Sequence, residues 1–251
     1  MAASAETDGL IHFRWQGVRH LGAGSLEPAS RLNIFHGANA AGKTSLLEAI
    51  HLLARSRSFV THRTGQLIGR GQESAVVSGR IRATGSLHRL GVAHRRGETR
   101  VRVDGRDVSA LSESAWLLPL QVLNTEAQRL LTDGPGTRRA FLNWGVFHVE
   151  PSYRDDWRRY RRALRQRNVA LRSGDPRLAS AWEPDMVEAA ASVEAQRVDF
   201  LEAVIPAALA IAEQWLPDLD LDWRYRRGWR AGETLDAVLA SGRRQELAQG
   251  F

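Results

Sequence analysis

Apolar and polar residues alternate along the N-terminal half of the chain in short stretches, a pattern typical of β-strands. Strands are predicted over residues 11–21 and 26–35, the second of which ends in an apolar run at residues 32–35. Further strand-like stretches lie at residues 75–81, 87–93, 100–103, 106–108 and 117–123. Asp104-Gly105 favours a tight turn between two of them. The pattern therefore predicts an antiparallel meander.

Apolar residues recur at helical spacing in the stretch at residues 45–54 and in most of the C-terminal half. Helices are predicted after Thr137, which could cap the first of them, and then over residues 152–171, 185–205 and 233–248. Pro206 is expected to kink or end the long third helix. An alternating stretch at residues 219–225 predicts one more strand.

The character of the chain changes near Pro151, where strand-like stretches give way to long helical ones. We therefore expect an α/β fold with a first lobe over residues 1–147 and a mainly helical second lobe over residues 148–216. Residues 217–251 are expected to return towards the first lobe.

A glycine-bounded loop joins the strand predicted over residues 26–35 to the helix predicted over residues 45–54. It matches the phosphate-loop pattern GxxxxGK[ST] with the residues Gly37, Ala38, Asn39, Ala40, Ala41, Gly42, Lys43 and Thr44. Glycine lets the backbone wrap its N–H groups around phosphate oxygens, and the following helix points its positive end at the anion. Lys43 would reach the outer phosphates of a nucleotide, and the Thr44 hydroxyl would ligate Mg²⁺. The strand–loop–helix context argues against a chance match.

Composition and charge limit the kinds of ligand and site that this chain can have. All but one of the 35 basic residues are arginines, and the exception, Lys43, occupies the position where a compact ammonium must fit beside phosphate oxygens. The net charge of +7 indicates an anionic partner such as nucleic acid. The 251 residues include no cysteine, which excludes disulfides, thiol nucleophiles and Cys-ligated metal sites. Neither a membrane span nor a secretory signal is recognisable, so a cytoplasmic protein without membrane contact is expected.

Arginines crowd the helix predicted over residues 152–171, where Trp157, Tyr160 and Leu164 form an apolar stripe. One interpretation is a solvated face whose arginines pair with neighbouring carboxylates. The other is a surface that contacts the DNA backbone independently of sequence. The residues assigned to that surface are Arg158, Arg161, Arg162 and Arg165.

The loop with Asn39, followed by Leu-Leu-Glu-Ala-Ile at residues 46–50, resembles that of SMC-like and ABC-type ATPases of DNA repair. Within that group the chain resembles the RecF family of bacterial DNA replication and repair proteins. Matching stretches recur in order at residues 17–21, 32–53, 57–59, 138–145, 161–172 and 227–229. Departures are Val60, in place of a second basic residue, and the residues around Glu126, where the family has a Ser-Pro-Glu-Asp-like sequence.

The resemblance implies an ABC-type P-loop ATPase lobe with an inserted, mainly helical lobe. It also implies an ATP-binding and DNA-binding protein of recombinational repair, replication and the SOS response, which binds single-stranded or gapped DNA and helps to load the recombinase. Recombination mediator proteins are the implied partners, and the family forms an ATP-dependent homodimer.

The family's signature motif and its acidic Walker B strand are not recognisable up to Phe251, so the chain looks truncated relative to the family. No catalytic residue is therefore assigned. The family shows weak DNA-dependent ATPase activity, but this chain is expected to bind ATP with little or no hydrolysis. Two alternatives stay open: a small-molecule kinase that uses the same loop, and a nonfunctional gene fragment. A kinase would not need the long basic helix.

Overall fold

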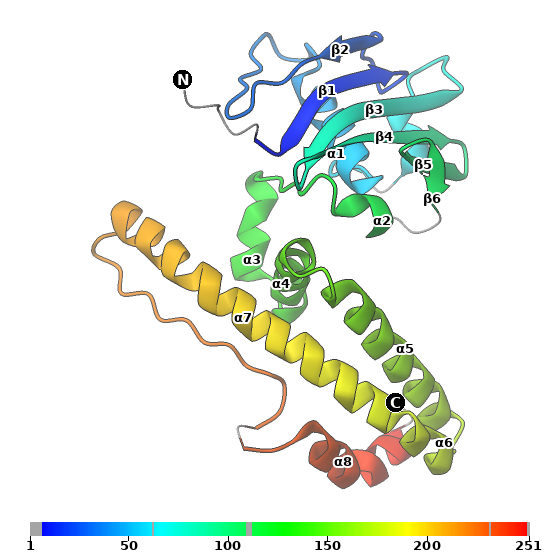
Figure 1. Cartoon of the computed structure of the whole chain (residues 1–251), viewed down its shortest axis with the longest axis vertical. Helices are drawn as coiled ribbons and strands as arrows, with labels where there is room; N and C mark the ends of the chain where they lie inside the picture. The colour runs from blue at the N-terminus through cyan, green and yellow to red at the C-terminus, as the bar shows by residue number, and fades with distance from the viewer. Residues whose placement is uncertain (1–6, 62, 109–111, 231, 250–251) are drawn as a thin grey trace. The chain divides into compact units, whose positions relative to one another are not determined.

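A six-stranded antiparallel sheet forms the framework of the first part of the chain (Figure 1). The computed structural model describes residues 7–61, 63–108, 112–230 and 232–249. The strands lie in the order β2-β1-β3-β4-β5-β6. Their bounds are β1 Gly9–Gln16, β2 Gly24–Leu26, β3 Ser74–Ala83, β4 Ser86–Arg95, β5 Glu98–Val103 and β6 Arg106–Val108. The predicted meander is confirmed from β3 to β6, and Asp104 and Gly105 form the turn with φ of 48° and 83°.

One face of this sheet packs on helix α1 (Lys43–Arg55). Alternate residues of the strands, among them Phe13, Val77 and Leu90, are fully or almost fully buried against apolar residues of α1 such as Leu52 and Leu53. The alternation that predicted the strands thus separates a core face from a solvent face. The first part of the chain is completed by the short helices η1 (Thr64–Leu67), α2 (Ser112–Ala115) and η2 (Thr125–Gln128).

The strand predicted over residues 26–35 is wrong beyond Leu26, because residues 27–41 adopt no regular structure. The apolar alternation is present, but a strand also needs a neighbour for its backbone groups, and none of the described strands pairs with residues 31–36. Leu32 and Ile34 are 72% and 75% exposed as a result. The strand predicted over residues 117–123 is likewise absent, although Leu117 and Leu118 are buried in the core.

The exposed Leu32 and Ile34 lead to a prediction about self-association. Unpaired extended backbone with exposed apolar side chains favours edge-to-edge association. The double variant Leu32→Ser/Ile34→Ser is therefore expected to shift the chain from aggregates to monomer in size-exclusion chromatography with light scattering. The control is Leu123→Ser, which replaces another exposed leucine outside this segment. Equal aggregation of the parent and the double variant would contradict the prediction.

The second unit is helical and begins at Arg129, since the chain divides into two compact units between Gln128 and Arg129. Its helices are α3 Arg129–Thr132, α4 Pro135–Val149, α5 Tyr153–Arg172, α6 Pro176–Ala181, α7 Glu183–Trp215 and α8 Leu235–Gln249. Helices α5 and α7 lie side by side and run in opposite directions (Figure 1). The division lies earlier than residue 147 because α4 packs on α7, where Gly145 sits against the ring of Phe200.

Three further expectations for this unit are corrected. Of the two outcomes expected at Pro206, a kink or an end of the helix, the end is wrong, because helix α7 continues to Trp215. A proline here frees the carbonyl of Glu202, and because residues 202–204 are exposed, water can satisfy that carbonyl. Residues 219–225 form no strand. Segment 217–249 groups with the helical unit, and α8 packs on α5 and α7.

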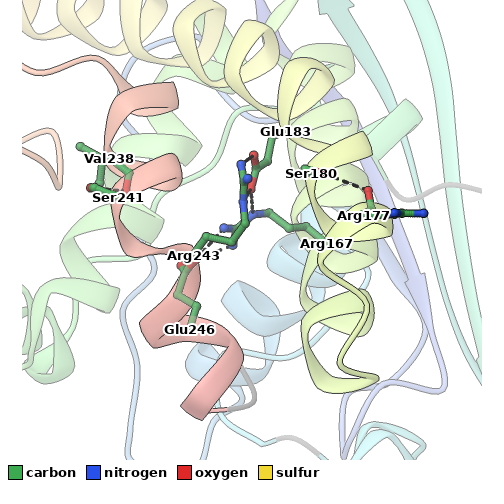
Figure 2. A network of polar contacts seen from close by, with 8 residues as sticks. All are labelled: Arg167, Arg177, Ser180, Glu183, Val238, Ser241, Arg243 and Glu246. Carbon is green, nitrogen blue, oxygen red and sulfur yellow. Dashed lines mark hydrogen bonds and ion pairs between the residues drawn. The ribbon is translucent and has the colours of Figure 1, made fainter.

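Buried ion pairs fasten α8 to the two long helices (Figure 2). Arg167 of α5 is 2% exposed. Its Nε donates to Glu183 Oε1 of α7 at 3.1 Å, and its Nη2 donates to Glu246 Oε2 of α8 at 2.6 Å. Arg243 of α8 also pairs with Glu183. Because each buried charge has an opposite partner, this network fixes α8 against α5 and α7.

None of the helices that the structure describes combines the length and the apolar character that a membrane-spanning segment needs.

Candidate functional site

The glycine-bounded loop of residues 37–44 leads directly into the first turn of α1, which begins at Lys43. Three residues of the loop have positive φ: Gly37 (149°), Ala40 (64°) and Gly42 (97°). Such conformations turn successive N–H groups in one direction. The first N–H groups of α1 also lack intrahelical acceptors. The loop and the helix start therefore form a concave set of donors suited to an anion.

Gly42 is required by its surroundings as well as by its φ. A Cβ built on Gly42 would lie 2.7 Å from Leu21 Cδ2, closer than side chains approach one another. The same point is 3.5 Å from His20 Nε2, so the segment of residues 17–21 borders the loop. A side chain at residue 42 would therefore displace the end of the Leu21 side chain, and the φ of 97° would strain it in any case.

The Lys43 ammonium lies over the loop. Its Nζ donates hydrogen bonds to the carbonyl oxygens of Gly37 and Ala38, both at 2.8 Å. Lys43 is thus held within reach of any phosphate that the loop takes up. The glycines, the helix start and this ammonium fit the phosphates of a nucleotide, and exposed Thr44 presents a hydroxyl in the first turn of α1. The structure brings all eight predicted loop residues into this one arrangement.

An ion pair between Arg19 and Glu48 joins the segment of residues 17–21 to α1, and it was not predicted from the sequence. Glu48 of α1 is 1% exposed. Its two carboxylate oxygens accept from Arg19 Nε and Nη2, each at 2.8 Å, and Ser58 Oγ donates to the same carboxylate. The hydrogen bond to Glu48 raises the pKa of Arg19, which keeps the guanidinium charged. Arg19 has φ of 53°, a conformation that the bidentate pair helps to hold.

Glu48 therefore ties two loops, around Arg19 and Ser58, to the helix that starts at the phosphate loop. Glu48→Gln keeps the size of the side chain but removes its charge and one acceptor. We expect this change to lower the free energy of unfolding by about 1.5–3 kcal/mol, the contribution of a hydrogen bond to a charged group. Urea denaturation followed by circular dichroism measures it. The control is exposed Glu73→Gln, and an equal, small effect of the two changes would contradict the prediction.

His51 lies on the same helix and serves packing. Its Nδ1 lies 2.7 Å from the carbonyl oxygen of Arg57, and its ring meets Phe59 edge-on. Burial lowers the pKa of His51. These contacts hold residues 57–59, which follow the left-handed C-cap Ser56, against α1.

The second candidate site lies along α5. At 100° per residue, Arg158, Arg161, Arg162 and Arg165 fall within an arc of about 100°, and all four are exposed. We call these four residues the arginine stripe. The buried residues of α5 lie on the opposite side of the helix, which packs on α6 and α7. The helix thus presents one basic face to solvent.

The contacts of the stripe leave its charge accessible. The Arg161 guanidinium lies 5.9 Å from the ring centre of Trp157, and that of Arg162 lies 6.0 Å from the ring centre of Trp182. Such stacking holds the guanidinium groups while their N–H donors stay free to bind a phosphate.

Acidic residues neutralise only part of this face. Asp155 Oδ1 lies 3.6 Å from Arg158 Nη1, whereas Arg165 has no ion pair with any residue that the structure describes. By contrast, Arg159 is paired with Asp185 and Glu188 of α7 and lies outside the stripe. Within the described part of the chain, the stripe is therefore paired at Arg158 and carries unpaired charge at Arg165. The side chain of Glu126 lies outside the described residues.

In the first unit, an antiparallel sheet packs on α1, and α1 starts at the phosphate loop. This arrangement defines the class of the unit as an ABC-type P-loop lobe. A helical lobe follows it along the chain. The whole chain superposes on a solved structure of the recombination mediator protein RecF-ATP in the RecFOR pathway with a TM-score of 0.79. That comparison covers 100% of this chain and 71% of the other at 20% identity, so it establishes the fold.

Curated relatives establish the family. The chain is 41% identical over 239 residues to the DNA replication and repair protein RecF of Thioalkalivibrio sulfidiphilus, covering 94% of this chain and 66% of the relative. It is 40% identical over 241 residues to RecF of Pseudomonas putida strain W619, covering 93% and 65%. The chain belongs to the RecF family. It spans slightly less than two thirds of the length of these relatives. No protein-family model matches the sequence.

Proposed function

We propose that this chain binds ATP and Mg²⁺ at residues 37–44 and binds DNA along the arginine stripe of α5. The observation that carries the proposal is the phosphate loop, in which Lys43 Nζ lies 2.8 Å from two loop carbonyl oxygens at the start of α1. Relatives named DNA replication and repair protein RecF support the choice of ATP and DNA over other anions. The cellular role would be recombinational repair and replication, within the SOS response.

Each part of the loop has a distinct role in nucleotide binding. The N–H groups at the start of α1 and in the loop would bind phosphate oxygens. Lys43 would exchange its carbonyl acceptors for the outer phosphates, and Thr44 Oγ1 would ligate Mg²⁺. Bound Mg²⁺-ATP would supply the negative charge that organises these donors. Segment 17–21, tied to α1 through Arg19 and Glu48, would keep the loop in this shape.

On the DNA side, arginines that contact phosphates bind without reading sequence. We propose single-stranded or gapped DNA as the ligand and recombination mediator proteins as partners, with the chain helping to load the recombinase. An ATP-dependent homodimer would place nucleotide between two subunits. These roles belong to the whole relatives, of which this chain spans 65–66%.

The proposal is tested by two binding measurements on the purified chain. Isothermal titration calorimetry with ATP, with and without Mg²⁺, is expected to show one site per chain that Mg²⁺ strengthens. Fluorescence anisotropy with labelled gapped DNA is expected to show binding that weakens steeply with salt. A panel of small phosphoryl acceptors with radiolabelled ATP covers the kinase alternative, and transfer to any of them would contradict the proposal.

Hydrolysis is expected to be slow or absent in this chain. Binding needs the loop, the helix start and Mg²⁺, whereas hydrolysis also needs a carboxylate that orients water and groups that organise the γ-phosphate. No residue of this chain is assigned either role. The measurement is phosphate release with ATP, Mg²⁺ and gapped DNA. Steady turnover that is lost in Lys43→Ala would contradict the expectation and direct attention to Glu126.

A further inference from the structure

The face of the sheet opposite α1 carries far more basic than acidic side chains. Strand residues that alternate with the buried positions include seven arginines, which we call the outer sheet face: Arg14, Arg80, Arg82, Arg89, Arg95, Arg100 and Arg102. Glu98 and Asp107 are the carboxylates among the strand residues on this face. The chain as a whole has 35 basic and 28 acidic residues, so general arginine use does not account for this imbalance.

The strand register sets these arginines around a floor of small residues. Arg14 of β1 lies opposite Ser78 of β3, which lies opposite Gly91 of β4, which lies opposite Arg102 of β5. Since neighbouring strands are about 4.8 Å apart, Arg14 and Arg102 lie on the order of 14 Å apart. The small side chains between them leave room for an extended ligand to approach the sheet.

The next row across the sheet places like charges together. Arg80 lies directly opposite Arg89, with His12 on the other side of Arg80. Like charges in directly opposed positions destabilise a sheet. An anion bound over Arg80 and Arg89 would relieve that repulsion, so the pair is suited to an anionic partner.

Internal carboxylates supply only part of that counter-charge. Arg102 Nε donates to Asp107 Oδ1 at 2.7 Å, and Arg100 Nη2 lies 3.6 Å from Glu98 Oε1, so the β5 edge is largely neutralised. Within the described residues, the side chains of Arg14 and Arg80 make no hydrogen bond or ion pair. Arg89 lies near the Asp104 carboxylate and contributes to lowering its pKa, so its charge is partly balanced. The unneutralised charge is therefore concentrated over β1 and β3, with a part of it on β4.

We propose that the outer sheet face is a contact surface for the sugar-phosphate backbone of DNA, in addition to the arginine stripe of α5. This inference rests on the proposed DNA-binding function. Guanidinium groups bind phosphates through two parallel hydrogen bonds, and several of them spaced along strands match a linear polyanion. The contacts would be independent of sequence, because phosphates carry no sequence information.

The test is the salt dependence of DNA binding by the triple variant Arg14→Gln/Arg80→Gln/Arg89→Gln of the full chain. With a labelled 30-base-pair duplex, the slope of log K against log salt concentration is expected to flatten by about 0.9 for each lost contact. Lysine at the same three positions keeps the charge and is expected to keep the slope. The matched control removes the same charge from the helical unit, as Arg224→Gln/Arg226→Gln/Arg230→Gln.

The outcomes separate this inference from the proposed function. A flattened slope in the glutamine variant alone, with ATP binding unchanged, supports it. An unchanged slope in the glutamine variant, together with loss of DNA binding in the α5 variants, contradicts DNA contact by the outer sheet face. The proposed function is then unaffected. If the parent binds no DNA at all, both fail. Parent binding to phosphatidylglycerol vesicles that the glutamine variant loses, with its DNA binding intact, overturns the inference in favour of a lipid surface.

Discussion

Replacing Lys43 with alanine is expected to abolish measurable ATP binding while the chain stays folded. The ammonium would make charge-assisted hydrogen bonds to phosphate oxygens, each contributing about 1.5–3 kcal/mol. Losing two of them would weaken affinity by roughly 10²–10⁴-fold. Lys43 is exposed to solvent at its hydrogen bonds with Gly37 and Ala38, so its removal leaves no buried charge unpaired. Equilibrium dialysis with labelled ATP measures the loss.

The control for this experiment is Arg70→Ala, which removes one exposed positive charge outside residues 37–44. It is expected to bind ATP as the parent does. Circular dichroism spectra and melting curves verify that both variants fold. Equal ATP affinity in Lys43→Ala and the parent would show that the loop is not the nucleotide site, whatever its sequence pattern.

Reversing the charge of the arginine stripe, as Arg158→Glu, Arg161→Glu, Arg162→Glu and Arg165→Glu together, is expected to produce the largest loss of DNA binding. Each lost phosphate contact lowers the log–log salt slope by about 0.7–0.9. Four contacts would therefore lower it by roughly 3–4. Anisotropy titrations of gapped DNA at several salt concentrations measure the slope.

A control must show that the change in net charge alone does not cause the loss of DNA binding. The control reverses four other exposed arginines of the helical unit, Arg177, Arg224, Arg226 and Arg230. Its salt slope is expected to stay close to that of the parent. If stripe and control variants behave alike, or if the stripe variant keeps the parental slope, α5 presents only a solvated face. Because Arg161 and Arg162 stack on tryptophans, a melting curve must accompany the titration.

The fold was predictable from the sequence where local pattern and tertiary pairing agree. Residues 74–108 alternate clearly and pair with their sequence neighbours, so the meander and its Asp104-Gly105 turn follow from the pattern. The strand predicted over residues 26–35 failed because pairing is a property of two segments, and the pattern of one cannot supply its neighbour. The helix end predicted at Pro206 is also wrong, because an exposed helix tolerates the carbonyl that a proline frees.

The candidate site also has features that local sequence predicts and features that it does not. The phosphate loop is contiguous in sequence, so its spacing alone is enough to predict eight nucleotide-binding residues, and this prediction awaits the binding measurements. The ion pair of Arg19 and Glu48 joins positions 29 residues apart, and no local pattern marks it. The outer sheet face depends on register: Arg80 and Arg89 come together only when β3 and β4 are aligned. Interactions set by register or by distant packing are therefore the part that sequence reasoning missed.

The C-terminal end of α7 has a consequence for how the helical unit unfolds. Residues 206–215 are exposed except for Ala212, whereas residues 186–193 of the same helix supply core side chains such as Met186 and Val193. A helical segment with little burial gains little free energy from staying helical, since short helices are marginal in water. We therefore expect this end to open and reclose locally. Its amide hydrogens are expected to exchange with solvent without waiting for the unit to unfold, while those near Met186 are expected to exchange only when the core opens.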